Sequence, residues 1–186
     1  MKQNNIRETL GKHAVIPVVS FESVEAVEPT IAKLIEQGIH CIEITLRNDC
    51  AFECIEKAIS LNTEGFDIGI GTVVSKAQIE KAKNIGVHFM VSPGINETLA
   101  DAFNTSGIPF IPGVATPSEI ILGMQQGWDT FKFFPANLFG DLKALKTYGN
   151  VFPSIMFCPT GGISEETHES YLALKNVISV GGSWLV

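Results

Sequence analysis

A lysine stands inside a short aromatic run, Phe131-Lys132-Phe133-Phe134-Pro135-Ala136, where we expect a β-strand that is buried on both sides. Burial disfavours the charged ammonium and lowers the pKa of a lysine amine, which can then attack a carbonyl carbon and form a Schiff base. The alternative is a lysine at a strand end that buries its stem and keeps its ammonium in water. The hexapeptide by itself leaves both interpretations open.

A second polar residue, Glu43, lies within an apolar run at residues 41–46. Successive side chains of a strand point to opposite faces, so Ile42, Ile44 and Leu46 share one side, and Cys41, Glu43, Thr45 and Arg47 share the other. We therefore expect Glu43 to point toward the interior and Arg47 to reach the carboxyl end of the strand. The alternative for Glu43 is an exposed edge position, which a strand covered by helices does not offer.

The same alternation turns Phe131 and Phe133 outward and Lys132 and Phe134 inward. Glu43 and Lys132 are therefore predicted to share one interior, where a carboxylate can carry protons for a reacting amine. A buried ion pair without any chemistry is the other interpretation.

Short apolar runs alternate with amphipathic segments along the whole chain, which is typical of β/α units and a parallel sheet. Eight strands are predicted at residues 14–19, 41–46, 67–73, 87–91, 108–111, 130–133, 155–158 and 177–180. Helices are predicted at residues 24–37, 51–60, 76–85, 96–104, 118–126, 141–147 and 165–174, with a short one near 5–11. We expect a single (β/α)8 TIM barrel over residues 1–186, with a doubly wound open sheet as the alternative. Because the chain ends just after the last predicted strand, we expect the final helix of a full barrel to be absent.

Two glycine pairs follow the last two predicted strands. They lie in Gly161-Gly162-Ile163-Ser164 and in Gly181-Gly182-Ser183. In this fold the loops after strands seven and eight commonly bind phosphate, because glycines let backbone N–H groups approach phosphate oxygens. A single glycine pair is usually only a tight turn, but two pairs at these places favour a phosphate site.

The composition excludes several classes of protein. The chain has 186 residues, 45% of them hydrophobic, and a net charge of −7, without any run of basic residues that would bind nucleic acid. No apolar run approaches the roughly 18 residues of a membrane span, and the N-terminus lacks the apolar segment of a signal peptide. We expect a cytoplasmic protein that binds neither nucleic acid nor membrane. The four cysteines form no metal-ligand spacing, and we expect reduced thiols at Cys41, Cys50, Cys54 and Cys158.

The polar residues and glycines together belong to a longer series of motifs, by which the chain resembles the class I 2-keto-3-deoxy-6-phosphogluconate (KDPG) / 4-hydroxy-2-oxoglutarate aldolases. The matching motifs run in order over nearly the whole chain. They are Val15-Ile16-Pro17-Val18, Glu43-Ile44-Thr45-Leu46-Arg47, Gly71-Thr72-Val73, Val91-Ser92-Pro93-Gly94, Ile111-Pro112-Gly113-Val114-Ala115-Thr116, Phe131-Lys132-Phe133-Phe134-Pro135-Ala136, Cys158-Pro159-Thr160-Gly161-Gly162-Ile163 and Gly181-Gly182-Ser183-Trp184.

The resemblance implies a role for each matching residue. Lys132 corresponds to the Schiff-base lysine and Glu43 to the acid/base glutamate. The implied substrate ligands and pocket residues are Arg47 and Thr72 for a pyruvate carboxylate, Phe134 and Pro93 around the imine, and Thr160 near the substrate hydroxyls. The implied phosphate ligands are Gly161, Gly162, Gly182 and Ser183. The resemblance further implies a homotrimer that needs no metal or other cofactor.

The expected reaction is reversible cleavage of KDPG to pyruvate and glyceraldehyde 3-phosphate, with 4-hydroxy-2-oxoglutarate as a second possible small 2-keto acid substrate. Two other classes of function stay open. One is a phosphate-binding barrel isomerase or epimerase in which Lys132 is only electrostatic, and the other is a non-catalytic sugar-phosphate binder. Neither of them needs an imine.

Overall fold

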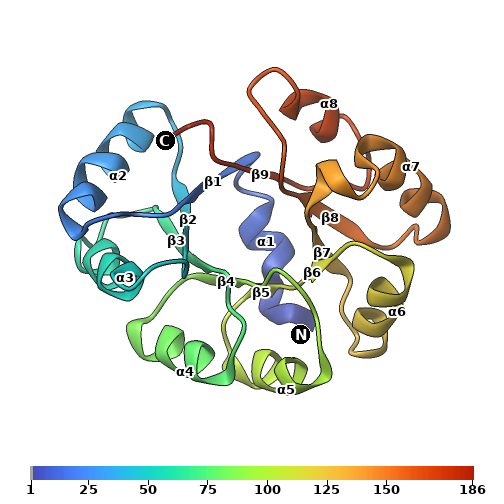
Figure 1. The fold of residues 1–186 in the computed structure, drawn as a ribbon, viewed down its shortest axis with the longest axis horizontal. Coiled ribbons are helices and arrows are strands. Elements are labelled where there is room, and N and C mark those ends of the chain that lie inside the picture. The colour runs from blue at the N-terminus through green and yellow to red at the C-terminus, as the bar shows by residue number, and fades with distance from the viewer. Residues whose placement is uncertain (1) are drawn as a thin grey trace.

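The structure is a computed structural model that describes residues 2–186, and in it strands alternate with helices along the chain (Figure 1). The strands are β1 (Val15–Val19), β2 (Cys41–Thr45), β3 (Asp67–Gly71), β4 (Phe89–Val91), β5 (Phe110–Ile111), β6 (Gly113–Val114), β7 (Thr130–Phe133), β8 (Met156–Pro159) and β9 (Val180–Gly182). The α-helices are α1 (Ile6–Leu10), α2 (Val27–Glu36), α3 (Ala51–Ser60), α4 (Lys76–Ile85), α5 (Glu97–Ser106), α6 (Pro117–Gln125), α7 (Asp141–Val151) and α8 (His168–Leu172). Three short 3-10 helices are η1 (Lys2–Asn5), η2 (Val24–Ala26) and η3 (Ala136–Leu138).

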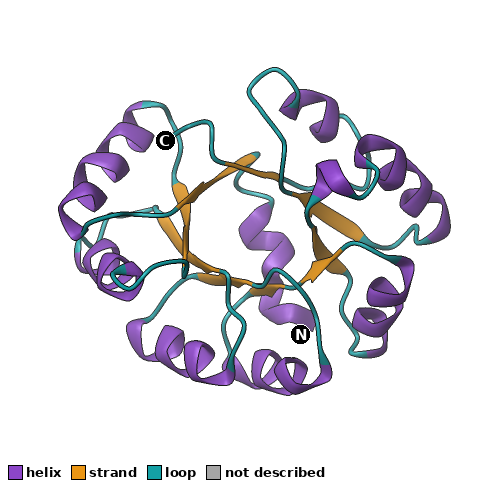
Figure 2. Cartoon of the chain, viewed as in Figure 1, coloured by secondary structure: helices purple, strands orange, loops and turns teal. Residues whose placement is uncertain are grey.

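All strand pairs are parallel and fall into two sheets. One sheet has six strands in the order β5-β4-β3-β2-β1-β9, and the other has three in the order β6-β7-β8. Isolated parallel bridges, Phe157 with Val177 and Thr160 with Gly181, connect β8 to the segment that contains β9. The strands curve around a common centre and the longer helices lie outside them (Figure 2). The α/β class and the parallel sheet are therefore as predicted.

Several predicted strands differ in their bounds, and the fifth and the last differ most. The fifth predicted strand, at 108–111, is observed only as β5, Phe110–Ile111. A further strand, β6, follows Pro112, which has no N–H to donate to a ladder. The last predicted strand, at 177–180, instead runs from Val180 to Gly182. Gly181 and Gly182 consequently lie inside a strand rather than in the loop after it, because both are paired with β1.

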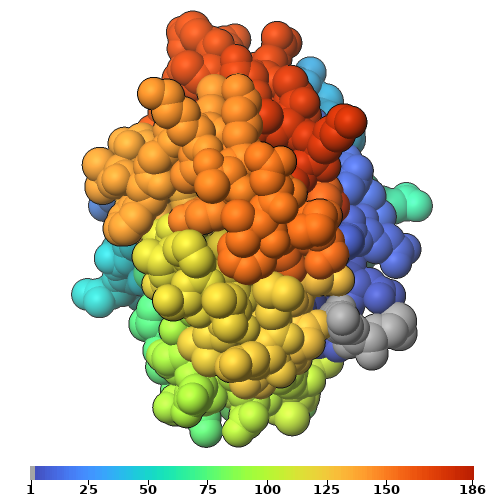
Figure 3. Space-filling model, turned by 90° about the vertical axis from the view of Figure 1, so that its right-hand side faces the viewer, coloured from blue at the N-terminus to red at the C-terminus, as the bar shows by residue number. Residues whose placement is uncertain are grey.

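The main core lies between the strands and the surrounding helices. Ile42 and Ile44 of β2 and Phe131 and Phe133 of β7 are fully buried there, as their parity predicted. Helix α2 presents Val27, Ile31 and Leu34, at helical spacing, to the same core. Seen from the side, α6 in yellow and α7 in orange form a continuous outer surface (Figure 3).

Helix caps hold several of these helices in place. At the start of α4 the Gln78 N–H donates to Ser75 Oγ at 3.3 Å, and the Ser75 N–H donates to Gln78 Oε1 at 3.0 Å. At the start of α6 the Thr116 N–H donates to the Glu119 carboxylate at 2.8 Å. In each cap a side chain pairs a backbone donor that the first turn leaves free.

A second apolar cluster fills the inside of the ring of strands. Ile6 and Leu10 of α1 pack there against Ile16, Phe89 and Cys158. In Figure 1 helix α1 lies across the space that the strands enclose. The helix closes the amino ends of the strands and leaves the carboxyl ends for a site.

The N-terminal segment also fixes the position of β7. The Gln3 carboxamide donates to Thr130 O at 2.7 Å and to Phe110 O at 3.3 Å, and it accepts from the Asp129 and Thr130 N–H groups at 3.0 Å each. Arg7 Nε donates to Thr130 Oγ1 at 2.8 Å. These bonds connect β5 of the six-stranded sheet to the start of β7 in the three-stranded sheet, two residues before Lys132.

Among residues 2–186, no helix is long and apolar enough to cross a membrane.

Replacing Gln3 by alanine should lower the free energy of unfolding by about 2–4 kcal/mol, because it leaves buried backbone groups of Thr130 without partners. Denaturant unfolding measures the loss. Gln37→Ala, at an exposed position, is the control and should stay within about 0.5 kcal/mol of the wild type. A Gln3 variant as stable as this control would contradict a structural role for the bridge.

Candidate active site

The centre of the site is an ion pair between Lys132 of β7 and Glu43 of β2. Lys132 Nζ lies 3.2 Å from Glu43 Oε1 and 3.4 Å from Oε2. The two side chains are only 7% and 4% exposed. The prediction that both residues point into one interior is therefore confirmed, and an exposed glutamate or a lysine that reaches water is excluded.

Glycines on the neighbouring strands make the room that this pair needs. A Cβ at Gly71 would overlap Glu43 Oε1, so only glycine lets the glutamate lie in this position. Gly113 is paired with Lys132 in the sheet, and a Cβ there would overlap the backbone of Pro93. The loop after β4 can therefore approach the strand next to the lysine. Both glycines were visible in the sequence motifs, but their contacts depend on strand register.

Aromatic and thiol groups surround the lysine. The Phe134 ring centroid is 5.2 Å from Lys132 Nζ, close enough for a cation–π contact. Cys158 is the neighbour of Lys132 on β8. Burial raises the pKa of the Cys158 thiol to about 11, so the group is neutral near pH 7 and does not compete as a nucleophile.

Two hydroxyl groups near Cys158 are buried without a hydrogen-bond partner in the described part of the chain. They belong to Thr160 and Ser179. The Thr160 hydroxyl packs against Gly181, where a Cβ would overlap it. Both hydroxyls adjoin the Cys158 thiol. Thr160 is 7% exposed and can still bind a substrate group or a water, whereas Ser179 is fully buried. Thr160 was predicted as a site residue, whereas Ser179 was missed because a single serine in an apolar run gives no signal.

The predicted carboxylate ligands lie at the carboxyl ends of β2 and β3. Arg47 is exposed and makes no ion pair with any residue that the structure describes, so its guanidinium can accept an anion. Thr72 is half-buried and has φ = 62°, a left-handed conformation that is uncommon for threonine. Thr45, between Glu43 and Arg47, is fixed by a bond of 2.5 Å to Ser20 Oγ.

The loop after β8 contains the first predicted glycine pair. Gly161 and Gly162 have φ = 102° and 72°, which only glycine adopts easily. The turn after β7 is joined to this loop, since the Ala136 N–H donates to Thr160 O at 2.9 Å and the Asn137 N–H donates to Gly161 O at 3.2 Å. The turn that follows the Lys132 strand is therefore hydrogen-bonded to the glycine loop.

The second predicted glycine pair is placed differently. Gly182 is the buried last residue of β9, and Ser183 is exposed directly after it. The Trp184 ring covers Gly182, and a Cβ at that position would overlap it. Of this pair of candidate phosphate ligands, Ser183 is thus the more open to solvent.

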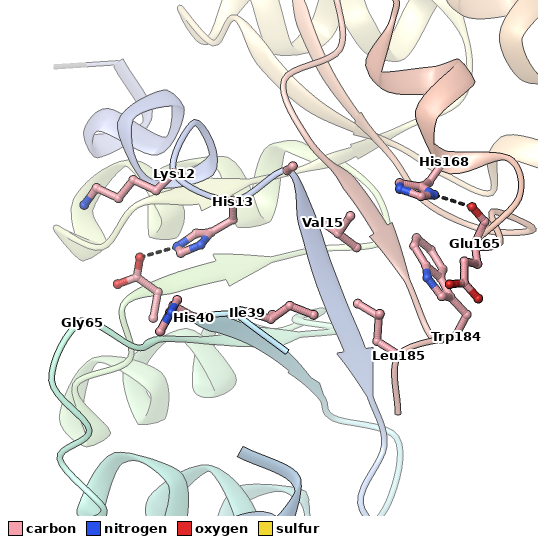
Figure 4. Close-up of a pocket in the computed structure, with 13 residues that line it drawn as sticks. Lys12, His13, Val15, Ile39, His40, Gly65, Glu165, His168, Trp184 and Leu185 are labelled. Carbon is pink, nitrogen blue, oxygen red and sulfur yellow. Dashed lines mark hydrogen bonds and ion pairs between the residues drawn. The ribbon is translucent and has the colours of Figure 1, made fainter. Parts of the chain in front are cut away.

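A cavity of about 770 Å³ lies elsewhere, at the amino ends of β1, β2 and β3 (Figure 4). There His13 Nε2 and Asp67 Oδ2 are 2.7 Å apart. The rings of His168 and Trp184 are 5.5 Å apart. None of the predicted site residues lines this cavity, so it is separate from the Lys132 site.

Comparison with known proteins agrees with this geometry. The sequence model of the family described as "Aldolase: KDPG and KHG aldolase" matches residues 6–186. The chain belongs to the KDPG and KHG aldolase family. The KHG/KDPG aldolase of Escherichia coli (strain K12) is 42% identical over 172 residues, which cover 92% of this chain and 80% of that relative.

Two solved structures from the aldolase family are similar over nearly the whole chain. One is the KDPG aldolase of Legionella pneumophila with pyruvate captured at low pH as a covalent carbinolamine intermediate, with TM-score 0.93, 39% identity, and coverage of 100% of this chain and 88% of that one. The other is the KDPG aldolase of Zymomonas mobilis ZM4 with 3-phosphoglycerate, with TM-score 0.94, 35% identity, and coverage of 99% and 87%.

Removing only one charge of the Lys132–Glu43 pair should lower the free energy of unfolding more than removing both charges. Lys132→Met leaves a buried carboxylate unpaired and should lower the free energy of unfolding by about 3–5 kcal/mol. The double variant Lys132→Met/Glu43→Gln should be more stable than Lys132→Met, as measured by denaturant unfolding. A double variant that loses the sum of the two single effects would show that the charges do not interact.

Proposed function

We propose that this protein is a class I aldolase that cleaves KDPG to pyruvate and glyceraldehyde 3-phosphate through an imine on Lys132. The observation that carries the proposal is the buried amine of Lys132, 3.2 Å from the Glu43 carboxylate and beside the Phe134 ring. Membership of the KDPG and KHG aldolase family supports it, as does the carbinolamine formed by pyruvate in the Legionella relative.

In this reaction the lysine amine attacks the C2 ketone of the substrate. The carbinolamine loses water to give a protonated imine, and this imine accepts the electron pair of the C3–C4 bond as the bond breaks. Glyceraldehyde 3-phosphate leaves, and an enamine of pyruvate stays on Lys132. Protonation of the enamine carbon and hydrolysis of the imine then release pyruvate and restore the amine.

Glu43 is the group placed to move the protons. Its carboxylate contacts Lys132 Nζ through both oxygens, so it can take the proton that the ammonium must lose before it attacks. The same carboxylate can then serve carbinolamine dehydration, deprotonation of the C4 hydroxyl and reprotonation of the enamine.

The remaining residues bind and enclose the substrate. Arg47 has a planar fork that matches a carboxylate, and Thr72 next to it offers a hydroxyl. Phe134 and Pro93 exclude water from the imine. The unpartnered hydroxyl of Thr160 is available to a substrate hydroxyl.

The phosphate of the substrate is assigned to the backbone of Gly161, Gly162 and Gly182 and to the Ser183 hydroxyl. The left-handed glycines of the first loop support this assignment, because such a backbone presents consecutive N–H groups to an anion. The phosphorylated three-carbon acid in the Zymomonas relative also supports it. We extend the proposal to 4-hydroxy-2-oxoglutarate, a 2-keto acid without phosphate, because the Escherichia coli relative is named for both substrates.

We further infer that residues 1–186 form one domain and that the two sheets are parts of one (β/α)8 barrel. Pro112 alone separates β5 from β6, and parallel bridges link β8 to the β9 segment. The homotrimer and the cytoplasmic location stay predictions.

Borohydride reduction in the presence of pyruvate should add one reduced pyruvyl group to the wild type, read by intact mass. Lys132→Ala should gain none, and Lys143→Ala, at an exposed position on α7, should react like the wild type. An isomerase or a non-catalytic binder would give no adduct. An adduct mapped to Lys143 or Lys146 would contradict the assignment of Lys132.

Glu43→Gln should still form the imine slowly, since the amine stays in place, but turnover of KDPG should fall roughly 10²- to 10⁴-fold, the usual effect of losing a positioned acid/base. Steady-state kinetics and trapping measure the two effects separately. Glu36→Gln, at an exposed position, is the matched control. Near-normal turnover of Glu43→Gln would mean that another group moves the protons.

A further inference from the structure

The loops assigned to the phosphate contain no cationic side chain. Residues 160–174 and 176–186 include neither lysine nor arginine, whereas Glu165 and Glu166 add negative charge. The pKa of Glu166 is lowered by its bond from Ser164 Oγ, so that this carboxylate stays charged near pH 7. A dianion bound here depends on neutral hydrogen-bond donors, and each donor therefore has a large influence on affinity.

Asn137 supplies a side-chain donor at this place. It lies in η3, which two residues separate from the end of the strand that carries Lys132, and its backbone N–H donates to Gly161 O at 3.2 Å. The residue is exposed, and its carboxamide forms no hydrogen bond with the residues that the structure describes. A Cβ placed on Gly162 would lie 2.5 Å from Asn137 Cγ and 2.7 Å from Nδ2.

The Asn137 carboxamide therefore packs directly on the left-handed glycine, beside its backbone. The N–H groups of Gly161 and Gly162 likewise donate to no acceptor within residues 2–186. The unpaired donors of Asn137, Gly161 and Gly162 are therefore neighbours in the segments that follow β7 and β8. A carboxamide has two N–H donors and no charge, so it can bind an anion without the repulsion that a carboxylate would cause.

We propose that the Asn137 carboxamide is a ligand of the substrate's distal phosphate and sets the preference for phosphorylated over unphosphorylated 2-keto acids. This inference rests on the proposed aldolase function. Among the described residues, no hydrogen bond joins Asn137 to Lys132 or Glu43. We therefore expect a change at Asn137 to affect only the distal end of the substrate. Because Asn137 lies in η3 and outside the glycine loop, its side chain can be changed without altering the backbone of that loop.

The test compares kcat/KM for KDPG and for 4-hydroxy-2-oxoglutarate in the wild type, Asn137→Ala and Asn137→Asp. Alanine should lower kcat/KM for KDPG about 10- to 100-fold, mainly through KM, which is the usual effect of one hydrogen bond to a charged group. The value for the unphosphorylated substrate should change less than about twofold. Aspartate has the same shape and adds repulsion, so its effect on KDPG should exceed that of alanine. Asn150→Ala, at an exposed position on α7, is the matched control.

A second measurement does not depend on catalysis. Inorganic phosphate should raise the melting temperature of the wild type and of Asn150→Ala, and it should raise that of Asn137→Asp much less. If the wild type cleaves neither substrate, the proposed function fails, and this phosphate measurement alone decides the role of Asn137. Equal stabilisation of all variants, or equal losses of kcat/KM for both substrates in Asn137→Ala, would overturn the inference.

Discussion

The buried ion pair of Lys132 and Glu43 is the interaction on which the rest of the site depends. Each charge alone would be too costly to keep in the interior, but together they compensate one another at 3.2 Å. The pair joins strands that are 89 residues apart in sequence, so it exists only when the whole ring of strands has the right register. In the proposed mechanism this carboxylate also takes the proton that the amine must lose, so that one contact serves both the fold and the chemistry.

Volume is the second constraint, because the interior must hold two long polar side chains and a substrate. Gly71 and Gly113 provide this space by leaving room for Glu43 and for the Pro93 loop. Below the pair, Ile6 and Leu10 of α1 fill the interior with apolar groups. The polar pair therefore lies next to an apolar layer that fills the amino-terminal side of the interior. Gln3, at the opposite end, holds β7 where its lysine is needed.

In the proposed function, the two ends of the substrate are bound in different ways. Arg47 offers a full positive charge to the carboxylate end of a 2-keto acid, whereas the glycine loop offers neutral donors to the other end. Since the protein has a net charge of −7, neither group benefits from a positive surface around it. In this proposal affinity comes from the charge of Arg47 at one end and from directed hydrogen bonds at the other, and this favours ligands that fit both ends.

Local patterns in the sequence determined the elements and the direction of their side chains. Helices α3 and α4 have the predicted bounds, because amphipathic spacing and caps are properties of a short window. Strand parity placed Glu43, Lys132, Phe131 and Phe133 on the correct sides, since the period of two is fixed by the backbone. The predicted barrel strands at 108–111 and 177–180 were shifted, because strand ends depend on which neighbour is available for pairing. Only the tertiary structure decided that Glu43 reaches Lys132, that Gln3 bridges the sheet, and that Asn137 lies on Gly162. These contacts join distant segments, and their distances follow from the register and curvature of the whole sheet, which no local window contains.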